Sequence, residues 1–135
     1  MKEKTIQSKI MLHASKSGHV LFRNHVGKGI TGKVVARAQS FRNLIAMINA
    51  IRDRSGRFTV VQNARETTFG LAVGSSDLIG ISPVGQFVSV EVKKPGQKPS
   101  EKQKDWLAMV TRLNGLAGTA TCNEDFDGIV GDEVL

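Results

Sequence analysis

The chain has 135 residues, of which 40% are hydrophobic, and it contains a single cysteine, Cys122. This length predicts one small domain over residues 1–135, with a core that buries roughly two-thirds of the surface exposed in the unfolded chain. No apolar run approaches the roughly 20 residues of a membrane span, residues 1–7 lack the apolar block of a signal peptide, and one cysteine excludes an internal disulfide. We therefore expect a cytoplasmic protein.

The formal net charge of +7 is unevenly distributed along the chain. Residues 123–135 contain five acidic and no basic side chains, so residues 1–122 hold 19 Lys and Arg against 7 Asp and Glu. This balance favours a polyanionic partner, and nucleic acid comes first. Six Phe, one Trp and no Tyr are too few for a protein that stacks single-stranded bases, which favours contacts to a duplex backbone. Two roles stay open for the acidic segment, namely screening of the site and improved solubility.

Hydrophobic periodicity and turn residues predict alternating helices and strands in the first half of the chain. Gly18 ends the first helix, and Ser40 caps the second. The expected elements are a helix over 3–16, a strand over 19–26, a glycine-rich loop over 27–33, a helix over 40–54, a strand over 58–61 and a polar connection over 63–68.

The second half of the chain predicts a hairpin, then a strand between two helices. Ser100 and Gln103 form a capping box that marks the start of the longer helix, whose apolar residues up to Leu113 are expected to face the core. The expected elements are strands over 78–82 and 86–93, a basic loop over 93–99, a helix over 101–114, a strand over 117–122 and a short helix over 124–130. This order predicts an α/β or α+β fold around a mixed sheet.

The loop Pro83-Val84-Gly85 sets the register of the predicted hairpin, with glycine where a left-handed residue is needed. Counting outward from this loop pairs Ile81 with Phe87 and Asp77 with Glu91. Like charges directly opposite on one face destabilise a sheet, because their β-carbons lie roughly 5 Å apart. A cation between the two carboxylates would reverse the sign of this interaction. The hairpin therefore predicts a divalent-metal site suited to phosphate-ester chemistry.

Lys93 lies two residues beyond Glu91, so strand alternation returns it to the same face. The alternative is an ordinary surface hairpin whose acidic residues are solvated or paired, because a Glu-x-Lys triplet alone is weak evidence. Two features favour the metal site. Alternate valines from Val88 to Val92 make the opposite face apolar, and the small residues 74–76 before Asp77 let a large ligand approach the backbone.

The glycine-rich loop matches two phosphate-binding motifs incompletely. Residues 27–32 fit G-x-G-x-x-G, and residues 27–33 fit most of a P-loop, but Val34 stands where a Ser or Thr hydroxyl would bind Mg²⁺. We therefore expect no nucleotide cofactor, and we interpret the segment as a mobile basic loop near a DNA backbone.

Three histidines and the cysteine allow a zinc interpretation. His13 lies on a predicted helix, His19 and His25 lie six residues apart on a predicted strand, and Cys122 is remote in sequence. Structural or surface roles for these histidines are therefore favoured over a zinc site. No base can be placed beside Cys122, so we expect this thiol to be buried and unreactive.

Several motifs occur in a fixed order along the chain. They are Glu3 with Ile6-Gln7, Phe22-Arg23-Asn24 with Gly27, residues 70–80, Glu91-Val92-Lys93, residues 99–103 and Gly115. In this order they resemble the VRR-NUC family (virus-type replication-repair nucleases), a branch of the PD-(D/E)xK nuclease superfamily. The resemblance covers residues 1–27 and 70–122, whereas residues 33–64 match no pattern. Ser76 stands where the superfamily has Pro, a change that metal binding tolerates because it needs only the carboxylate.

The resemblance implies a restriction-endonuclease-like core, with a mixed β-sheet flanked by helices. It also implies a stand-alone homodimeric enzyme of a bacterial or phage-infected cell, which cuts branched DNA such as Holliday junctions. Two alternatives stay open, namely a nucleic-acid-binding module without chemistry and a nuclease that acts on flaps, nicks or linear duplex. For the dimer surface, the apolar face of the predicted helix 40–54 is the candidate.

The resemblance also implies a role for each site residue. Asp77, Glu91 and the Val92 carbonyl would hold Mg²⁺ or Mn²⁺, Glu3 would reach a second metal or its water shell, Lys93 would orient or deprotonate the attacking water, and Gln103 would support the site. A pKa lowered by desolvation would allow Lys93 to accept a proton. The basic candidates for contacts to the DNA backbone are Arg23, Lys28, Lys33, Arg37, Lys94 and Lys98.

Overall fold

The computed structural model describes residues 1–38 and 58–131, and it describes their side chains except those of residues 33–38 and 58–60. The chain forms two compact units, which are described separately. The first contains Met1–Val26 and Phe69–Leu135, and the second contains Gly27–Thr68. Among the described helices, none has the length and apolar character needed to cross a membrane. The predicted helix 40–54 and its proposed dimer surface lie outside the described residues.

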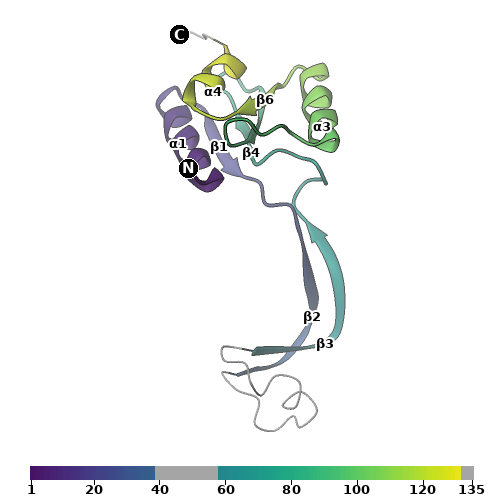
Figure 1. Cartoon of the computed structure of the whole chain (residues 1–135). Coiled ribbons are helices and arrows are strands. Elements are labelled where there is room, and N and C mark those ends of the chain that lie inside the picture. Colours follow the sequence, from purple (N-terminus) through teal and green to yellow (C-terminus); the bar gives the residue numbers. More distant parts are fainter. Residues whose placement is uncertain (39–57, 132–135) are drawn as a thin grey trace. The chain divides into compact units, whose positions relative to one another are not determined.

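The first unit is a mixed α/β fold around a four-stranded sheet with strand order β1-β4-β5-β6 (Figure 1). Pairing is antiparallel between β1 and β4 and between β4 and β5, and parallel between β5 and β6. The elements of this unit are α1 (Glu3–Lys16), β1 (Val20–Arg23), β4 (Leu78–Ile81), β5 (Phe87–Val92), α3 (Glu101–Arg112), β6 (Leu116–Ala120) and α4 (Asn123–Val130). The predicted fold class, a mixed sheet flanked by helices, is confirmed.

Local sequence signals explain why these elements begin and end where they do. The capping box of α3 forms as predicted: the Gln103 amide donates to the Ser100 hydroxyl, and the Gln103 side chain accepts from the Ser100 amide. Because β5 and β6 are parallel, a crossover must connect them, and α3 provides it. In the tight turn between β4 and β5, Gly85 has a φ of 85°, as expected for a left-handed position.

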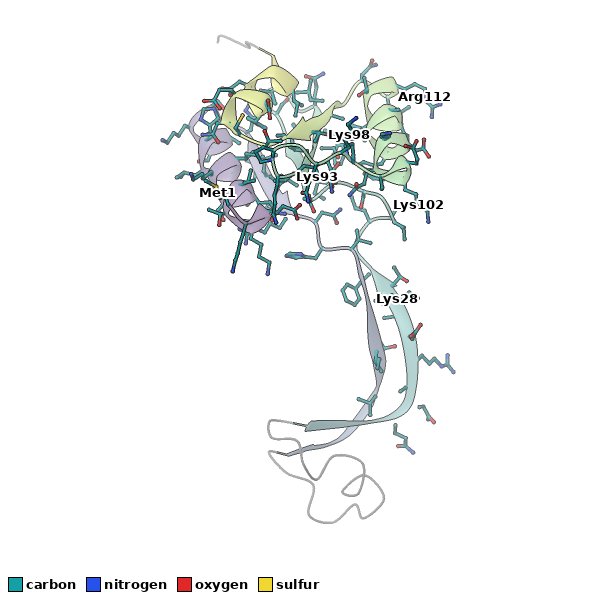
Figure 2. The ribbon with its side chains drawn as sticks, viewed as in Figure 1. Met1, Lys28, Lys93, Lys98, Lys102 and Arg112 are labelled. Atoms are coloured by element: carbon teal, nitrogen blue, oxygen red, sulfur yellow. The ribbon has the colours of Figure 1, made fainter. Side chains whose placement is uncertain are left out.

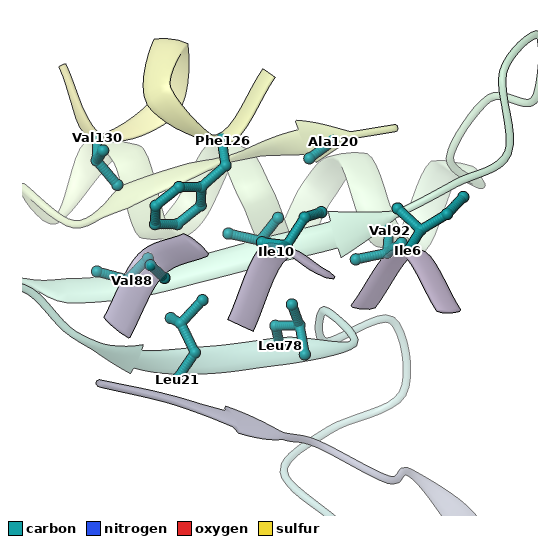
Figure 3. Packing of buried hydrophobic residues seen from close by; sticks show 11 residues of the cluster. Ile6, Ile10, Leu21, Leu78, Val88, Val92, Ala120, Phe126 and Val130 are labelled. Atoms are coloured by element: carbon teal, nitrogen blue, oxygen red, sulfur yellow. The ribbon is translucent and has the colours of Figure 1, made fainter. Parts of the chain in front are cut away.

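One face of the sheet forms the main core (Figure 3). Ile6, Ile10 and Ala14 follow one side of α1 at helical spacing, and they pack against the alternate valines of β5. Phe126 of α4 is fully buried in the same cluster. The expectation that Leu113 also faces a core is wrong. It is exposed, because α3 ends at Arg112 and Leu113 is its C-cap.

The second unit contains a two-stranded hairpin, β2 (Gly27–Ala38) with β3 (Phe58–Phe69). The predicted loop over 27–33 and the predicted connection over 63–68 are therefore wrong, because both are strands. At Gly32, an added Cβ would lie 2.7 Å from the Gln62 carbonyl oxygen, so this glycine permits close approach of the two strands. Asn63 has a positive φ of 54°. The glycines and polar residues fit an exposed ribbon as well as they fit a loop.

Candidate active site

The β4–β5 hairpin has the predicted register, with Ile81 opposite Phe87 and Ile79 opposite Ser89. Continued by one step, this register places Asp77 opposite Glu91, at the end of the hairpin far from its turn. A carboxylate oxygen of Asp77 (Oδ2) accepts a hydrogen bond of 3.0 Å from the Val92 amide. This bond fixes the Asp77 carboxylate beside the backbone of β5. Two acidic side chains, far apart in sequence, therefore meet at one end of the sheet.

Glu91 is the centre of the site, with only 1% of its surface exposed. The Lys93 ammonium lies 2.8 Å from Glu91 Oε1. The Gln103 side-chain amide donates a hydrogen bond to the same oxygen. Gln103 thus has both roles considered from the sequence, because its own carbonyl oxygen closes the capping box of α3 at 2.8 Å. The start of α3 is therefore tied directly to the carboxylate of Glu91.

Burial changes the electrostatics of all three charged groups. Desolvation raises the pKa of Asp77 and the pKa of Glu91 above their ordinary values, and the Asp77 charge raises that of Glu91 further. Burial lowers the pKa of Lys93, but the hydrogen bond to Glu91 and the negative charges around it raise that pKa more. The expectation that desolvation leaves Lys93 with a lowered pKa is therefore wrong. Lys93 is an ammonium ion held by its carboxylate neighbours.

The site has an unsatisfied acceptor that fits a divalent cation. The second carboxylate oxygen of Glu91 (Oε2) is buried and has no hydrogen-bond partner. A buried acceptor without a partner is costly, and the neighbouring Asp77 carboxylate adds repulsion. Mg²⁺ and Mn²⁺ prefer oxygen ligands, and carboxylate and backbone carbonyl oxygens are the groups present here. The donor set of Asp77, Glu91 and the Val92 carbonyl therefore suits either ion.

Glu3 contributes charge without joining the pair as a direct neighbour. It lies in the first turn of α1 and is partly buried, and its charge raises the pKa of Asp77. Within residues 1–38 and 58–131, no group of three or more His, Cys, Asp or Glu side chains is close enough to hold a metal. The structure thus brings together Asp77, Glu91, Lys93 and Gln103, and it leaves Glu3 at longer electrostatic range.

Asn24 fixes the loop that carries Asp77, a role that the sequence did not reveal. Its side-chain amide donates to the Ser75 hydroxyl at 2.8 Å and to the Ser76 carbonyl oxygen at 2.9 Å. Its backbone amide donates to the Asp77 carbonyl oxygen at 2.7 Å. The sequence signal was present, since Asn24 is part of one of the motifs, but no local pattern links it to a loop more than 50 residues away.

The predicted DNA contacts fall into three groups. Lys94 and Lys98 are exposed on the loop that follows the site, and Arg23 is exposed at the end of β1 with its guanidinium 2.6 Å from the Ser8 hydroxyl. Lys28 is exposed on the hairpin unit. The side chains of Lys33 and Arg37 lie outside the described residues. Figure 2 shows Lys93, Lys98 and Lys102 together on the sheet unit.

The histidines have structural neighbours. His13 Nε2 lies 2.7 Å from an Asp127 carboxylate oxygen, and the buried His19 packs edge-on against the ring of Phe126. His13 on α1 and His19, just before β1, thus both contact α4. The expectation of a buried Cys122 is wrong: the thiol is exposed, because Cys122 lies between β6 and the first turn of α4.

The fold and site define a restriction-endonuclease-like protein, with acidic residues and a lysine at one end of a mixed sheet. A family model described as the VRR-NUC domain matches residues 35–123, which is more than half of the chain. The chain therefore belongs to the VRR-NUC family, and this domain implies a nuclease-type function in DNA processing. No curated protein matches the chain.

The matched region differs from the region of the sequence resemblance. It includes Asp77, Glu91, Lys93 and Gln103, and it also spans residues 35–64, which the motifs did not reach. It begins after α1 and β1, so Glu3 and Asn24 lie outside it. The matched residues contain the β4–β5 hairpin and the α3 and β6 elements that follow it.

Proposed function

We propose that this protein is a Mg²⁺- or Mn²⁺-dependent, structure-selective DNA endonuclease that resolves Holliday junctions as a homodimer. The observation that supports this proposal most strongly is the pairing of a half-buried Asp77 with the fully buried Glu91, which has an unpartnered oxygen beside the Lys93 ammonium. A carboxylate pair of this kind is destabilising by itself, and a divalent cation would make it favourable.

Asp77, Glu91 and the Val92 carbonyl would hold the cation, and Glu3 would act on a second ion or its water shell. When bound, such an ion polarises a phosphoryl oxygen and lowers the pKa of its bound water. Gln103 keeps Glu91 Oε1 oriented by donating to it, and the Val92 amide does the same for Asp77. These contacts hold both carboxylates before substrate arrives, which reduces the cost of reorganisation during the reaction.

Lys93 acts beside the carboxylates as a cation. Its ammonium group stabilises negative charge that develops on the nonbridging phosphate oxygens, and it orients the attacking water by donating a hydrogen bond. Its raised pKa favours the protonated form, so we assign Lys93 the role of a cation and not that of a proton acceptor. Any role in deprotonation would require Lys93 to lose its contact with Glu91, which the structure gives as 2.8 Å.

The substrate is held through its phosphates. Lys94 and Lys98 are exposed next to the site, Arg23 is exposed at the end of β1, and Lys28 is exposed on the hairpin. Contacts of this kind neutralise phosphates and carry no base specificity, so selectivity would come from the shape of the DNA. A four-way junction offers two equivalent strands for cleavage, and a two-fold dimer provides two matching sites.

A panel of labelled DNAs tests this function. Four-way junctions, flaps, nicked duplexes and linear duplexes of matched length are incubated with the protein in Mg²⁺, in Mn²⁺ and in EDTA. The expected result is paired nicks in the junction, dependent on the ion, with little cutting of linear duplex. Asp77→Asn serves as the control that binds DNA without cutting. Binding without any cleavage would instead identify a non-catalytic module, and stronger cleavage of flaps or nicks would change the substrate.

A further inference from the structure

The two faces of the sheet in the first unit are covered unequally. One face packs against α1 and α4, as described above. On the other face, α3 lies against β5 and β6. Of the helices that the structure describes, none shields the side chains of β1 and β4 on this second face, as their exposure shows. Among the residues that the structure describes, the uncovered half of this face is therefore exposed to solvent.

The uncovered half is apolar. Register places Val20 opposite Ile81 and Phe22 opposite Ile79, with Phe87 next to Ile81 across the hairpin. Strand alternation puts these five residues on one face, whereas Leu21 and Val88 point to the other. We call the surface formed by Val20, Phe22, Ile79, Ile81, Phe87 and Leu113 the apolar face. The exposed fractions are 53% for Val20, 59% for Phe22, 54% for Ile81, 39% for Phe87 and 70% for Leu113.

A groove of about 460 Å³ extends the apolar face toward α3. Phe87 and Leu113 belong to both, so the face and the groove are continuous. The groove is otherwise lined mainly by Trp106, Met109 and Val110 of α3, and none of its lining residues is charged. A surface without charged side chains cannot neutralise phosphates, which argues against DNA as its occupant. An uncharged apolar strip beside a groove instead favours a protein surface.

We propose that the apolar face is the surface through which two copies of this chain form a dimer. This proposal deepens the proposed function and rests on it, because paired cleavage of a junction requires two active sites. The assignment to a second copy is argued from area. A large side chain has roughly 150–250 Å² of surface. With the exposed fractions given above, Val20, Phe22, Ile81, Phe87 and Leu113 together expose on the order of 500 Å² of apolar surface. A stable interface buries about 800 Å² per partner, of which roughly 65% is apolar in homodimers.

The apolar face extends from the turn of the hairpin toward the active site. Ile81 and Phe87 lie next to the turn, four residues along the strands from Asp77 and Glu91. Four residues of strand span roughly 13 Å. Phe22 and Ile79 lie nearer to the site, because Ile79 is two residues from Asp77 on the same face. A second copy packed on the apolar face would therefore lie beside the carboxylate end of the sheet.

Sedimentation velocity of the full chain from about 0.1 to 100 µM tests the proposal, a range that covers interfaces of ordinary strength. Wild type is expected to be a dimer in the upper part of the range. The double variant Phe22→Asp/Ile81→Asp should weaken dimerisation at least ~100-fold, because two central apolar anchors are lost. Its circular dichroism should be unchanged, since both side chains are already exposed. If it unfolds, Val20→Lys on the edge strand tests the same face.

Leu12→Asp is the matched control, because Leu12 is 64% exposed on α1, on the other side of the sheet. It should dimerise like wild type. A monomeric wild type throughout the range, a double variant as dimeric as wild type, or equal dissociation of the Leu12 control would each overturn the proposal.

Failure of this proposal and failure of the proposed function give different results. The monomeric variant should still nick DNA in Mg²⁺, but it should lose the paired cuts in one junction. If the apolar face is not the interface, sedimentation is unchanged by the double variant while nicking persists. If the protein is not a nuclease, no DNA is cut by any variant, and the sedimentation difference remains.

Discussion

Strand β5 divides its side chains between two faces of the sheet with opposite physical properties. Val88, Val90 and Val92 are fully buried in the main core, where apolar contacts stabilise the fold. Ser89 and Glu91 are just as buried on the opposite face, but each needs a polar partner from α3. Ser89 has one in the Trp106 indole at 2.9 Å, whereas one oxygen of Glu91 has none. Burial of the valines thus stabilises the fold, whereas burial of Glu91 leaves an acceptor whose hydrogen-bonding capacity is not met by the described residues.

The largest expected effect is at Glu91, on the side of β5 that meets α3. Glu91→Gln preserves the shape of the side chain but removes its charge, so cleavage in saturating Mg²⁺ should fall at least ~10³-fold, as for groups that act in the transition state. Single-turnover cleavage of a labelled junction measures this loss. Glu101→Gln is the matched control, since Glu101 is exposed on α3 and forms a surface ion pair with Lys104. Full activity of Glu91→Gln would remove this carboxylate from the site.

On the core face of β5, a substitution of similar size should instead affect stability. Ile10 is fully buried against β5, so Ile10→Ala should lower the free energy of unfolding by roughly 2–5 kcal/mol. Leu12→Ala on the exposed side of α1 should change it by less than about 0.5 kcal/mol. Urea denaturation followed by circular dichroism measures both. Equal values for the two variants would show that α1 does not pack as described.

A Lys93 variant distinguishes the contribution of charge stabilisation from that of metal binding. Lys93→Ala removes the ammonium but neither carboxylate, so turnover should fall about 10²-fold, while the Mg²⁺ concentration for half-maximal rate changes little. Lys94→Ala is the neighbouring control. It should weaken DNA binding and reduce its salt dependence, without slowing cleavage at saturating protein. An unchanged rate for Lys93→Ala would exclude Lys93 from the chemistry.

An Asn24 variant tests whether activity depends on the position of the Asp77 carboxylate as well as on its charge. Asn24→Ala removes the bonds to Ser75 and Ser76, so activity should fall about 10–100-fold, with a higher Mg²⁺ requirement. Ser8→Ala, which removes the partner of Arg23 on the same edge of the sheet, is the control. If excess Mg²⁺ does not restore any activity to Asn24→Ala, its role is structural and not one of positioning.

The smallest expected effect is a gain in stability. Burial raises the pKa of Asp77, so the stability from this group is fully present below its unfolded pKa near 3.8 and is lost as the pH rises through the folded pKa. At neutral pH in EDTA, Asp77→Asn should therefore raise the melting temperature by a few degrees, while still accepting the Val92 hydrogen bond.

The gain should disappear at low pH, where the Asp77 carboxyl is neutral, and it should reverse in Mg²⁺, which stabilises only the wild type. Asp105→Asn, at an exposed position on α3, is the control. A lower melting temperature for Asp77→Asn in EDTA at neutral pH would contradict the cost assigned to the buried carboxylate.

Much of the sheet unit was predictable because its signals are local. The three-residue turn fixed the hairpin register, and with it the position of Asp77 opposite Glu91. The capping box fixed the start of α3 and placed Gln103. The hairpin β2–β3 was missed because glycine and polar residues are typical of both loops and exposed strands. Gly32 shows the ambiguity: close packing of two strands, and not a turn, explains this residue.

Other features depend on contacts between distant parts of the chain. No periodicity indicates that Asn24 meets the loop before Asp77, or that Leu113 lies beyond the last turn of α3. The pKa of Lys93 was misjudged because desolvation was considered without the three carboxylates around it. Each of these errors concerns an interaction that exists only after the sheet has formed.

The hydrogen bond from the Asn24 amide to the Asp77 carbonyl closes a loop that begins at the end of β1 and returns at the start of β4. Because the entropy of loop closure grows only with the logarithm of length, doubling this segment would cost about 0.6 kcal/mol. A change in the length of the segment between these two residues should therefore cost little in loop-closure entropy. Loss of the closure point should matter more, because this hydrogen bond fixes where the Asp77 carboxylate lies.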